Sequence, residues 1–169
     1  TGARLDLNGF SLGIAEPLTI NGVGYGLGDF ASGALMNSSG STVTYSGVLT
    51  ITTATIKADF GQINLTATTH VGTTVVTLGG SGIGTLSAAL ATGAASIVKI
   101  GTGTWTMSAT NSAATGAVSI YLGTLKLGAN GATNSAFGTS AGGVFVYSGA
   151  VLDFNTFTIP TSEAITING

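Results

Sequence analysis

Short runs of alternating apolar and polar residues recur along the chain, and they are clearest between residues 96 and 128. In this stretch, pairs of alternating runs are joined by a glycine-containing turn, and a longer polar segment separates one pair from the next. Alternation places successive side chains on opposite faces of a β-strand, so each run is predicted to be a strand with one buried face. The pattern thus predicts an all-β protein built from short strands.

Comparison of this stretch with its neighbours predicts which side chains point inward. Residues 98–107 align with residues 118–127, and these align in turn with residues 144–154 when one extra residue is allowed. The apolar positions that coincide are expected to form a stacked core, and they are Val98, Ile100, Trp105, Met107, Val118, Ile120, Leu125, Leu127, Val144, Val146, Leu152 and Phe154.

A unit of this size cannot bury its apolar face alone, but stacked units can. We therefore predict a single-stranded parallel β-helix, or β-solenoid, with coils of about 20–27 residues. Stacking of the coils would place Val98, Val118 and Val144 in one inward column and leave Lys99 on the outside. No linker or change in composition interrupts the sequence, so residues 1–169 are predicted to form one continuous solenoid.

The same alignment predicts two contacts on the outer face. Lys126 and Asp153 occupy equivalent outward positions on successive units. Neighbouring parallel strands lie about 4.8 Å apart, so these two charged side chains are expected to meet. Tyr121 and Tyr147 are also equivalent and outward, and they are expected to stack on each other, with contact to a carbohydrate as the alternative.

A longer repeat relates the two ends of the sequence. Residues 1–22 align without a gap with residues 148–169, at a constant offset of 147 residues. We interpret residues 148–169 as the beginning of the next copy of a repeat that starts at residues 1–22, and the chain as a window on a tandem array. Equivalent sequences should follow equivalent paths, so the turn at Asn8 is expected to match the turn at Asn155.

Composition and charge narrow the function. Charged residues make up 6% of the chain, the net charge is −2, and the four basic residues are widely separated. Nucleic-acid binding requires a basic face that neutralises phosphates, so no nucleic-acid partner is predicted. Glycine and threonine interrupt every apolar run well before the length of a transmembrane helix, so no membrane span is predicted in this segment.

The residues that could belong to a catalytic or metal site lack companions. His70 is the only histidine and the chain has no cysteine, so no metal-ligand set is visible. The glycine-rich loop at 79–84 follows a strand, as in dinucleotide-binding folds, but no acidic residue that could bind a ribose occurs between Asp59 and Asp153. The acidic residues related by the long repeat would lie several coils apart, too far for glycoside hydrolysis. We predict no enzyme activity, no cofactor and no metal.

The segment from residue 97 to residue 125 also resembles a known family. The matching residues are Ile97-Val98-Lys99, Gly101, Gly103-Thr104, Asn111, Gly116 and Gly123-Thr124-Leu125. In order and spacing they are similar to the autotransporter-associated β-strand repeat, and residues 33–51 and 149–159 look like other parts of the same repeat. The resemblance implies a right-handed parallel β-helix in exported surface proteins, and it implies no catalytic residues.

These observations favour an extracellular structural protein that forms a stiff rod or filament at the bacterial cell surface. Its partners would be further copies of itself, in tandem in the same chain or as an end-to-end or lateral polymer. The alternative is an adhesin passenger module that binds glycans or host and cell surfaces. A polar groove with clustered aromatic side chains would favour this alternative.

Overall fold

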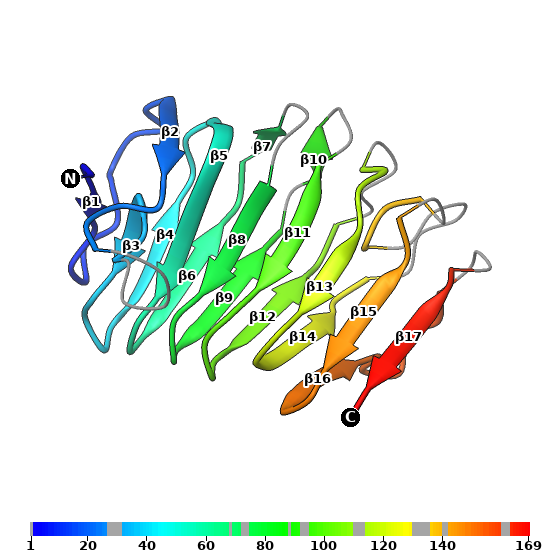
Figure 1. Ribbon diagram of the computed structural model, residues 1–169. Helices are drawn as coiled ribbons and strands as arrows, with labels where there is room; N and C mark the ends of the chain where they lie inside the picture. Colours follow the sequence, from blue (N-terminus) through cyan, green and yellow to red (C-terminus); the bar gives the residue numbers. More distant parts are fainter. Residues whose placement is uncertain are drawn as a thin grey trace.

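The protein is a β-solenoid in which short parallel strands stack coil upon coil, and the predicted fold class is confirmed (Figure 1). The computed structural model describes residues 2–26, 32–67, 69–71, 75–87, 89–91, 95–109, 114–129, 136–139, 142–159 and 163–169. Within these ranges no helix occurs. The two ends of the chain lie at opposite ends of the stack (Figure 1).

The strands of the described ranges form two sheets. They are β1 (Leu5–Asp6), β2 (Leu18–Gly22), β3 (Leu35–Asn37), β4 (Thr42–Tyr45), β5 (Leu49–Ala58), β6 (Gln62–Leu65), β7 (Thr69–Val71), β8 (Val75–Gly79), β9 (Ile83–Leu86), β10 (Leu90–Ala91), β11 (Ser96–Lys99), β12 (Thr104–Met107), β13 (Val118–Ile120), β14 (Gly123–Leu127), β15 (Val144–Tyr147), β16 (Ala150–Asp153) and β17 (Ile165–Asn168). One sheet has the order β1-β3-β5-β8-β11-β13-β15-β17, with β2, β7 and β10 attached to it, and the other has the order β16-β14-β12-β9-β6-β4.

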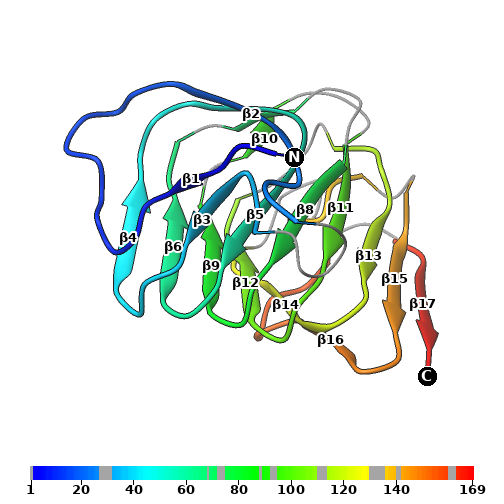
Figure 2. The ribbon, with the colours of Figure 1, turned by 60° about the vertical axis from the view of Figure 1, so that its left-hand side comes forward.

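A full coil has three sides, which we number in the order in which the chain passes through them. The first side contains β2, the beginning of β5, β7 and β10. The second contains β1, β3, the end of β5, β8, β11, β13, β15 and β17. The third is the sheet from β4 to β16 (Figure 2). The long strand β5 belongs to two sides because it bends between Ile51 and Ala54, where its register against β2 shifts.

The inward side chains of the three sides fill the interior of the solenoid. Trp105 of β12 shows how closely they fit, because it is fully buried and its indole Nε1 donates a hydrogen bond to the Gly79 carbonyl, at 2.9 Å. Its partner in the neighbouring strand β9 is Gly84. A Cβ at Gly84 would overlap the indole ring, so the glycine provides the room for the largest side chain of the core.

The predicted register of residues 98–100 is wrong by one position. The partner of Val118 is Ile97, not Val98, and the partner of Ile120 is Lys99. Ile97 and Lys99 are therefore buried, whereas Val98 and Ile100 are partly exposed. A shift of one residue moves a side chain to the opposite face of a strand, and this segment needs the shift because the turn that follows it is longer by one residue.

The extra residue lies between the second and third sides. From Ile97 to Thr104 the chain advances seven positions, whereas from Val118 to Thr124, their ladder partners, it advances six. A constant offset between the two units therefore holds for β12 and fails for β11. The inward column predicted for Val98 contains Ile97 instead, followed by Val118 and Val144.

Most of the other residues that were predicted to lie in the core are buried. Trp105, Met107, Val118, Ile120, Leu125, Leu127, Val144 and Val146 are buried. Leu152 is partly buried and packs against the core, and Phe154 is 39% exposed, contrary to the prediction for this residue. Both lie in the last coil, where the neighbouring coil is present on one face alone among the residues that the structure describes.

Candidate functional site

The corner between the second and third sides is built largely from glycine. Gly61, Gly82 and Gly103 occupy this corner in three consecutive coils. A Cβ at Gly82 would overlap the carbonyl oxygen of Gly61, and a Cβ at Gly103 would overlap that of Gly82. The backbones of consecutive coils are thus in direct contact here. The glycines carry no side chain, so the surface at their positions lies close to the main chain.

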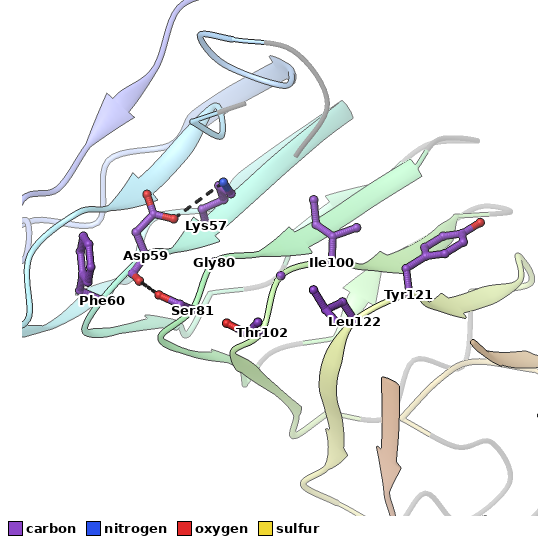
Figure 3. Close-up of a pocket in the computed structure, with 10 residues that line it drawn as sticks. Lys57, Asp59, Phe60, Gly80, Ser81, Ile100, Thr102, Tyr121 and Leu122 are labelled. Atoms are coloured by element: carbon purple, nitrogen blue, oxygen red, sulfur yellow. Dashed lines mark hydrogen bonds and ion pairs between the residues drawn. The ribbon is translucent and has the colours of Figure 1, made fainter. Parts of the chain in front are cut away.

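A groove of about 540 Å³ runs along this corner, parallel to the stacking direction. Its lining residues are Lys57, Asp59, Phe60, Gly80, Ser81, Ile100, Gly101, Thr102, Tyr121 and Leu122 (Figure 3). They come from the turns of four consecutive coils. Neighbouring coils are about 4.8 Å apart, so the first and the last of these turns are separated by roughly 14 Å. The glycine-rich segment 79–84, considered above as a dinucleotide loop, forms part of this corner between β8 and β9.

The two ends of the groove differ in chemistry. At one end, Lys57 Nζ lies 3.9 Å from Asp59 Oδ1, and the hydroxyl of Ser81 donates a hydrogen bond to the main-chain carbonyl of Asp59 (Figure 3). Phe60 adds apolar surface at this end, whereas at the other end the lining residues Ile100, Tyr121 and Leu122 present apolar surface without a charged group. A ligand that fits this groove would therefore combine apolar faces with hydrogen-bonding groups.

Tyr121 stacks on Tyr147 of the next coil, as the sequence predicts. The two ring centroids are 4.5 Å apart and the ring planes differ by 10°. Tyr121 is 49% exposed, so the stack holds the ring in place while much of its surface stays open to solvent. Offset stacking of this kind contributes about 0.5–1.5 kcal/mol beyond the burial of area.

Lys99 lies directly beneath the groove, and alternation alone had placed it outside. Its side chain is fully buried, and its Nζ donates hydrogen bonds to the carbonyls of Ile100 at 2.8 Å, Gly101 at 2.6 Å and Leu122 at 3.0 Å. The ammonium group thereby ties together two consecutive turns that form the floor of the groove. Burial lowers the pKa of Lys99 to about 8.

The expected ion pair between coils is also present. Lys126 and Asp153 are ladder partners in β14 and β16, and Lys126 Nζ lies 3.7 Å from Asp153 Oδ2. Both side chains are partly exposed, so the pair is worth about 0–1 kcal/mol. The position of the pair is more informative than its energy, because it shows that β14 and β16 align in the register that the sequence predicts.

The remaining candidate residues do not converge on a site. His70 lies in β7 on the first side, opposite Thr50 of β5. Asp6 accepts hydrogen bonds from the Ser38 hydroxyl at 2.7 Å and from the Asn8 amide at 3.0 Å. Burial raises its pKa, and these hydrogen bonds outweigh that effect, so the pKa of Asp6 is lowered. Among the described residues, no three side chains of His, Cys, Asp or Glu gather in one place.

In comparisons with known proteins, no protein-family model, curated protein or solved structure matches the chain. The resemblance to the autotransporter-associated repeat therefore depends on the sequence match from residue 97 to residue 125. One residue of that match, Asn111, lies outside the described residues. In the described part of the chain, no helix is long and apolar enough to cross a membrane.

Proposed function

We propose that this solenoid is a structural segment of an extracellular protein, and that it provides length and stiffness at a bacterial cell surface. The observation that carries the proposal is the unbroken ladder of parallel strands from β1 to β17. In such a ladder each coil is held by its neighbours through main-chain hydrogen bonds and a shared core, so bending requires many contacts to open together. The proposed location follows from the family resemblance.

Stiffness is supported further by the contacts at the corners. The glycine corner lets the main chains of consecutive coils touch, and Lys99 joins the turns of two coils through three carbonyl groups. Contacts between coils are direct here and include little side-chain freedom. The segment is thus suited to act as a rigid spacer that keeps its two ends at a fixed distance.

Solution scattering tests the rod. We expect the maximum dimension to increase by about 30 Å when one further 147-residue repeat is added to the chain, since that repeat occupies slightly more than six coils of about 4.8 Å. A flexible string of separate units would instead give an increase that falls with each added copy. Antibody labelling of intact cells, with permeabilised cells as the control, tests the location; labelling confined to permeabilised cells would contradict it.

A second candidate function, glycan binding, is favoured by one specific observation. The groove combines the half-exposed ring of Tyr121 with the hydroxyl groups of Ser81 and Thr102 and the carboxylate of Asp59. Sugar rings have apolar faces that pack on aromatic rings and hydroxyl groups that bond to polar side chains. An elongated oligosaccharide therefore matches both the shape and the chemistry of the groove.

Binding to an array of oligosaccharides tests this second candidate. For any glycan that binds, Tyr121→Ala should weaken the affinity by roughly tenfold or more, the factor that corresponds to 1.4 kcal/mol. Tyr25→Ala is the matched control, because Tyr25 is an exposed tyrosine that does not line the groove. Equal losses of affinity for both variants, or the absence of any bound glycan, would contradict glycan binding at the groove. The structural role would then be the only proposed function.

A further inference from the structure

The sequence repeat and the solenoid do not have the same period. β1 lies on the second side, paired with β3, whereas its equivalent in the repeat, the end of β16, lies on the third side, paired with β14. Likewise, β2 lies on the first side, and its equivalent β17 lies on the second. In the second copy, each of these two strands therefore lies one side further along the coil than its equivalent in the first copy.

The strand order explains this shift. From β1 to β15 the second side takes six ladder steps, through β3, β5, β8, β11 and β13, and the chain then rounds one corner to reach β16. A repeat of 147 residues thus fills six coils and one additional side. It does not fill a whole number of coils, so the next copy cannot begin on the side where the first one began.

The equivalent segments nevertheless have the same local structure. Asn8 and Asn155 both have positive φ, at 43° and 47°. In each turn the Asn amide donates to the carboxylate two residues earlier, at 3.0 Å for Asp6 and 2.8 Å for Asp153. The following hydrogen bond, from the amide of Phe10 or its equivalent to the carbonyl three residues earlier, measures 2.8 Å in both. The turn at Asn155 therefore matches that at Asn8, as the sequence predicts.

Their surroundings differ in the strands that cover them: β1 and β2 pair with the coil that follows, whereas β16 and β17 pair with the coil that precedes. Leu7 and Ile20 are both 5% exposed, because β3 and β5 cover them, whereas their equivalents Phe154 and Ile167 are 39% and 76% exposed. The same coil is thus covered in one setting and open in the other. What covers it at residues 1–22 is the part of the repeat that follows, beginning at residue 23.

We propose that the open edge formed by β16 and β17 is covered by the next copy of the repeat in the same chain, turned by one side of the coil. The inference rests on the proposed rod. The pairing seen for residues 1–22 then gives the junction: β16 pairs with β3 of the second copy, as β1 pairs with β3 here, and β17 pairs with the beginning of β5 of the second copy, as β2 does here. The third side of one copy continues as the second side of the next.

Specific contacts follow from this superposition. Asp6 accepts hydrogen bonds from the amide of Ser38 at 3.1 Å and from its hydroxyl at 2.7 Å, so Asp153 should accept the same two from Ser38 of the second copy. Phe154 and Ile167 should become buried, as Leu7 and Ile20 are. Successive copies would be turned by about a third of a turn around the rod axis, and their grooves would face three directions in succession.

Cysteine pairs in a two-copy chain test the junction. The chain is residues 1–169 followed by a second copy that starts at residue 23, and it contains no native cysteine. We expect Asp153→Cys to cross-link through a short bifunctional thiol reagent with Ser38→Cys of the second copy. The matched control is Asp6→Cys with Ser38→Cys in the first copy, whose native side chains are in contact.

A third pair reports the alternative junction without rotation. Thr44 holds the outward position on the third side that Lys126 and Asp153 hold further along. If copies stacked without turning, β16 would lie beside β4 of the second copy, and Asp153→Cys would cross-link with Thr44→Cys of that copy. That result would overturn the rotation and leave the rod intact. Failure of both junction pairs, with the control pair reacting, would overturn the continuous junction itself.

Amide hydrogen exchange provides a second measurement that uses no substitution. A chain of residues 1–169 extended by residues 23–66 of the second copy should protect the amides of Ile165–Asn168 by roughly tenfold or more relative to the unextended chain. Unchanged exchange would contradict the proposal. The rod is judged separately, by the increase of about 30 Å per repeat in scattering.

Discussion

Lys99 shows how a charged residue occupies a core position in this fold. The aliphatic part of a lysine side chain packs like an apolar residue, and hydrogen-bond acceptors within reach of the ammonium group offset part of the cost of burying its charge. The turn that follows β11 supplies two carbonyls, and the turn of the next coil supplies the third. Sequence alternation assigns the residue to the outside because the pattern cannot register acceptors that come from a different coil.

Replacement of Lys99 by methionine measures the value of these contacts. Lys99→Met keeps the shape of the side chain but leaves the carbonyls of Ile100, Gly101 and Leu122 without this donor. We expect the free energy of unfolding in urea to fall by about 1–3 kcal/mol, the cost of unsatisfied buried polar groups. Lys126→Met is the control and should cost no more than about 1 kcal/mol, because its ion pair is partly exposed. Equal effects of the two substitutions would contradict this role.

The dependence of stability on pH gives an independent test of the same residue. The pKa of Lys99 is about 8 in the folded protein, against 10.5 for an ordinary lysine, so between these two pH values the unfolded chain keeps a proton that the folded protein has lost. The contribution of Lys99 to stability therefore rises with pH through this interval. We expect the difference in unfolding free energy between the native chain and Lys99→Met to increase from pH 7.5 to about pH 9.5. A flat difference would show that the amine is not titrating in this interval.

At the scale of strands and turns, the sequence predicts the elements well and their register less well. The contact of Lys126 with Asp153 and the stack of Tyr121 on Tyr147 were both predictable, because alternation holds without interruption within β14 and β16 and at the ends of β13 and β15. The inward face of β11 was not predictable, because the following turn contains one residue more than its neighbour. The groove was not predictable either, because its residues come from four coils and form no continuous sequence motif. They are brought together only by the register of the stacked strands.

The pairing of a glycine with a tryptophan in adjacent strands leads to a prediction for β9. Gly84→Ala places a methyl group where the indole of Trp105 lies, so we expect a loss of about 1–3 kcal/mol in unfolding free energy. Trp105 is the only tryptophan, so its fluorescence during urea unfolding reports on this location. Gly40→Ala is the control, because a Cβ there meets nothing within 4 Å. If both alanines were tolerated equally, the core around Trp105 would have to be looser than the structure shows.

At the scale of the whole molecule, each coil contributes one layer to a continuous core and packs mainly against the neighbouring coils. Stability in such an arrangement is approximately a sum of terms for coils and for contacts between neighbouring coils. β12 lies between β9 and β14, whereas β17 pairs with β15 on one edge and its residues are all exposed. The stack should therefore open progressively from this end.

Hydrogen exchange along the unextended chain measures this gradient. We expect the amides of β17 to exchange fastest among the strands of the second side and those of β11 and β8 to exchange much more slowly, because the latter are held on both edges. Mass spectrometry of peptides from each coil resolves the order. Uniform exchange across all coils would mean that the solenoid unfolds as one cooperative unit.

The glycine corner has a consequence for how such a sequence can change over generations. Gly61, Gly82 and Gly103 each sit against the carbonyl of the preceding coil, so a side chain introduced at one of them clashes with a backbone that has no room to move. Insertion or loss of an entire coil preserves every one of these contacts, because the coil brings its own glycine with it. Variation in this protein should therefore proceed by duplication and deletion of units, while single replacements at the corner are eliminated.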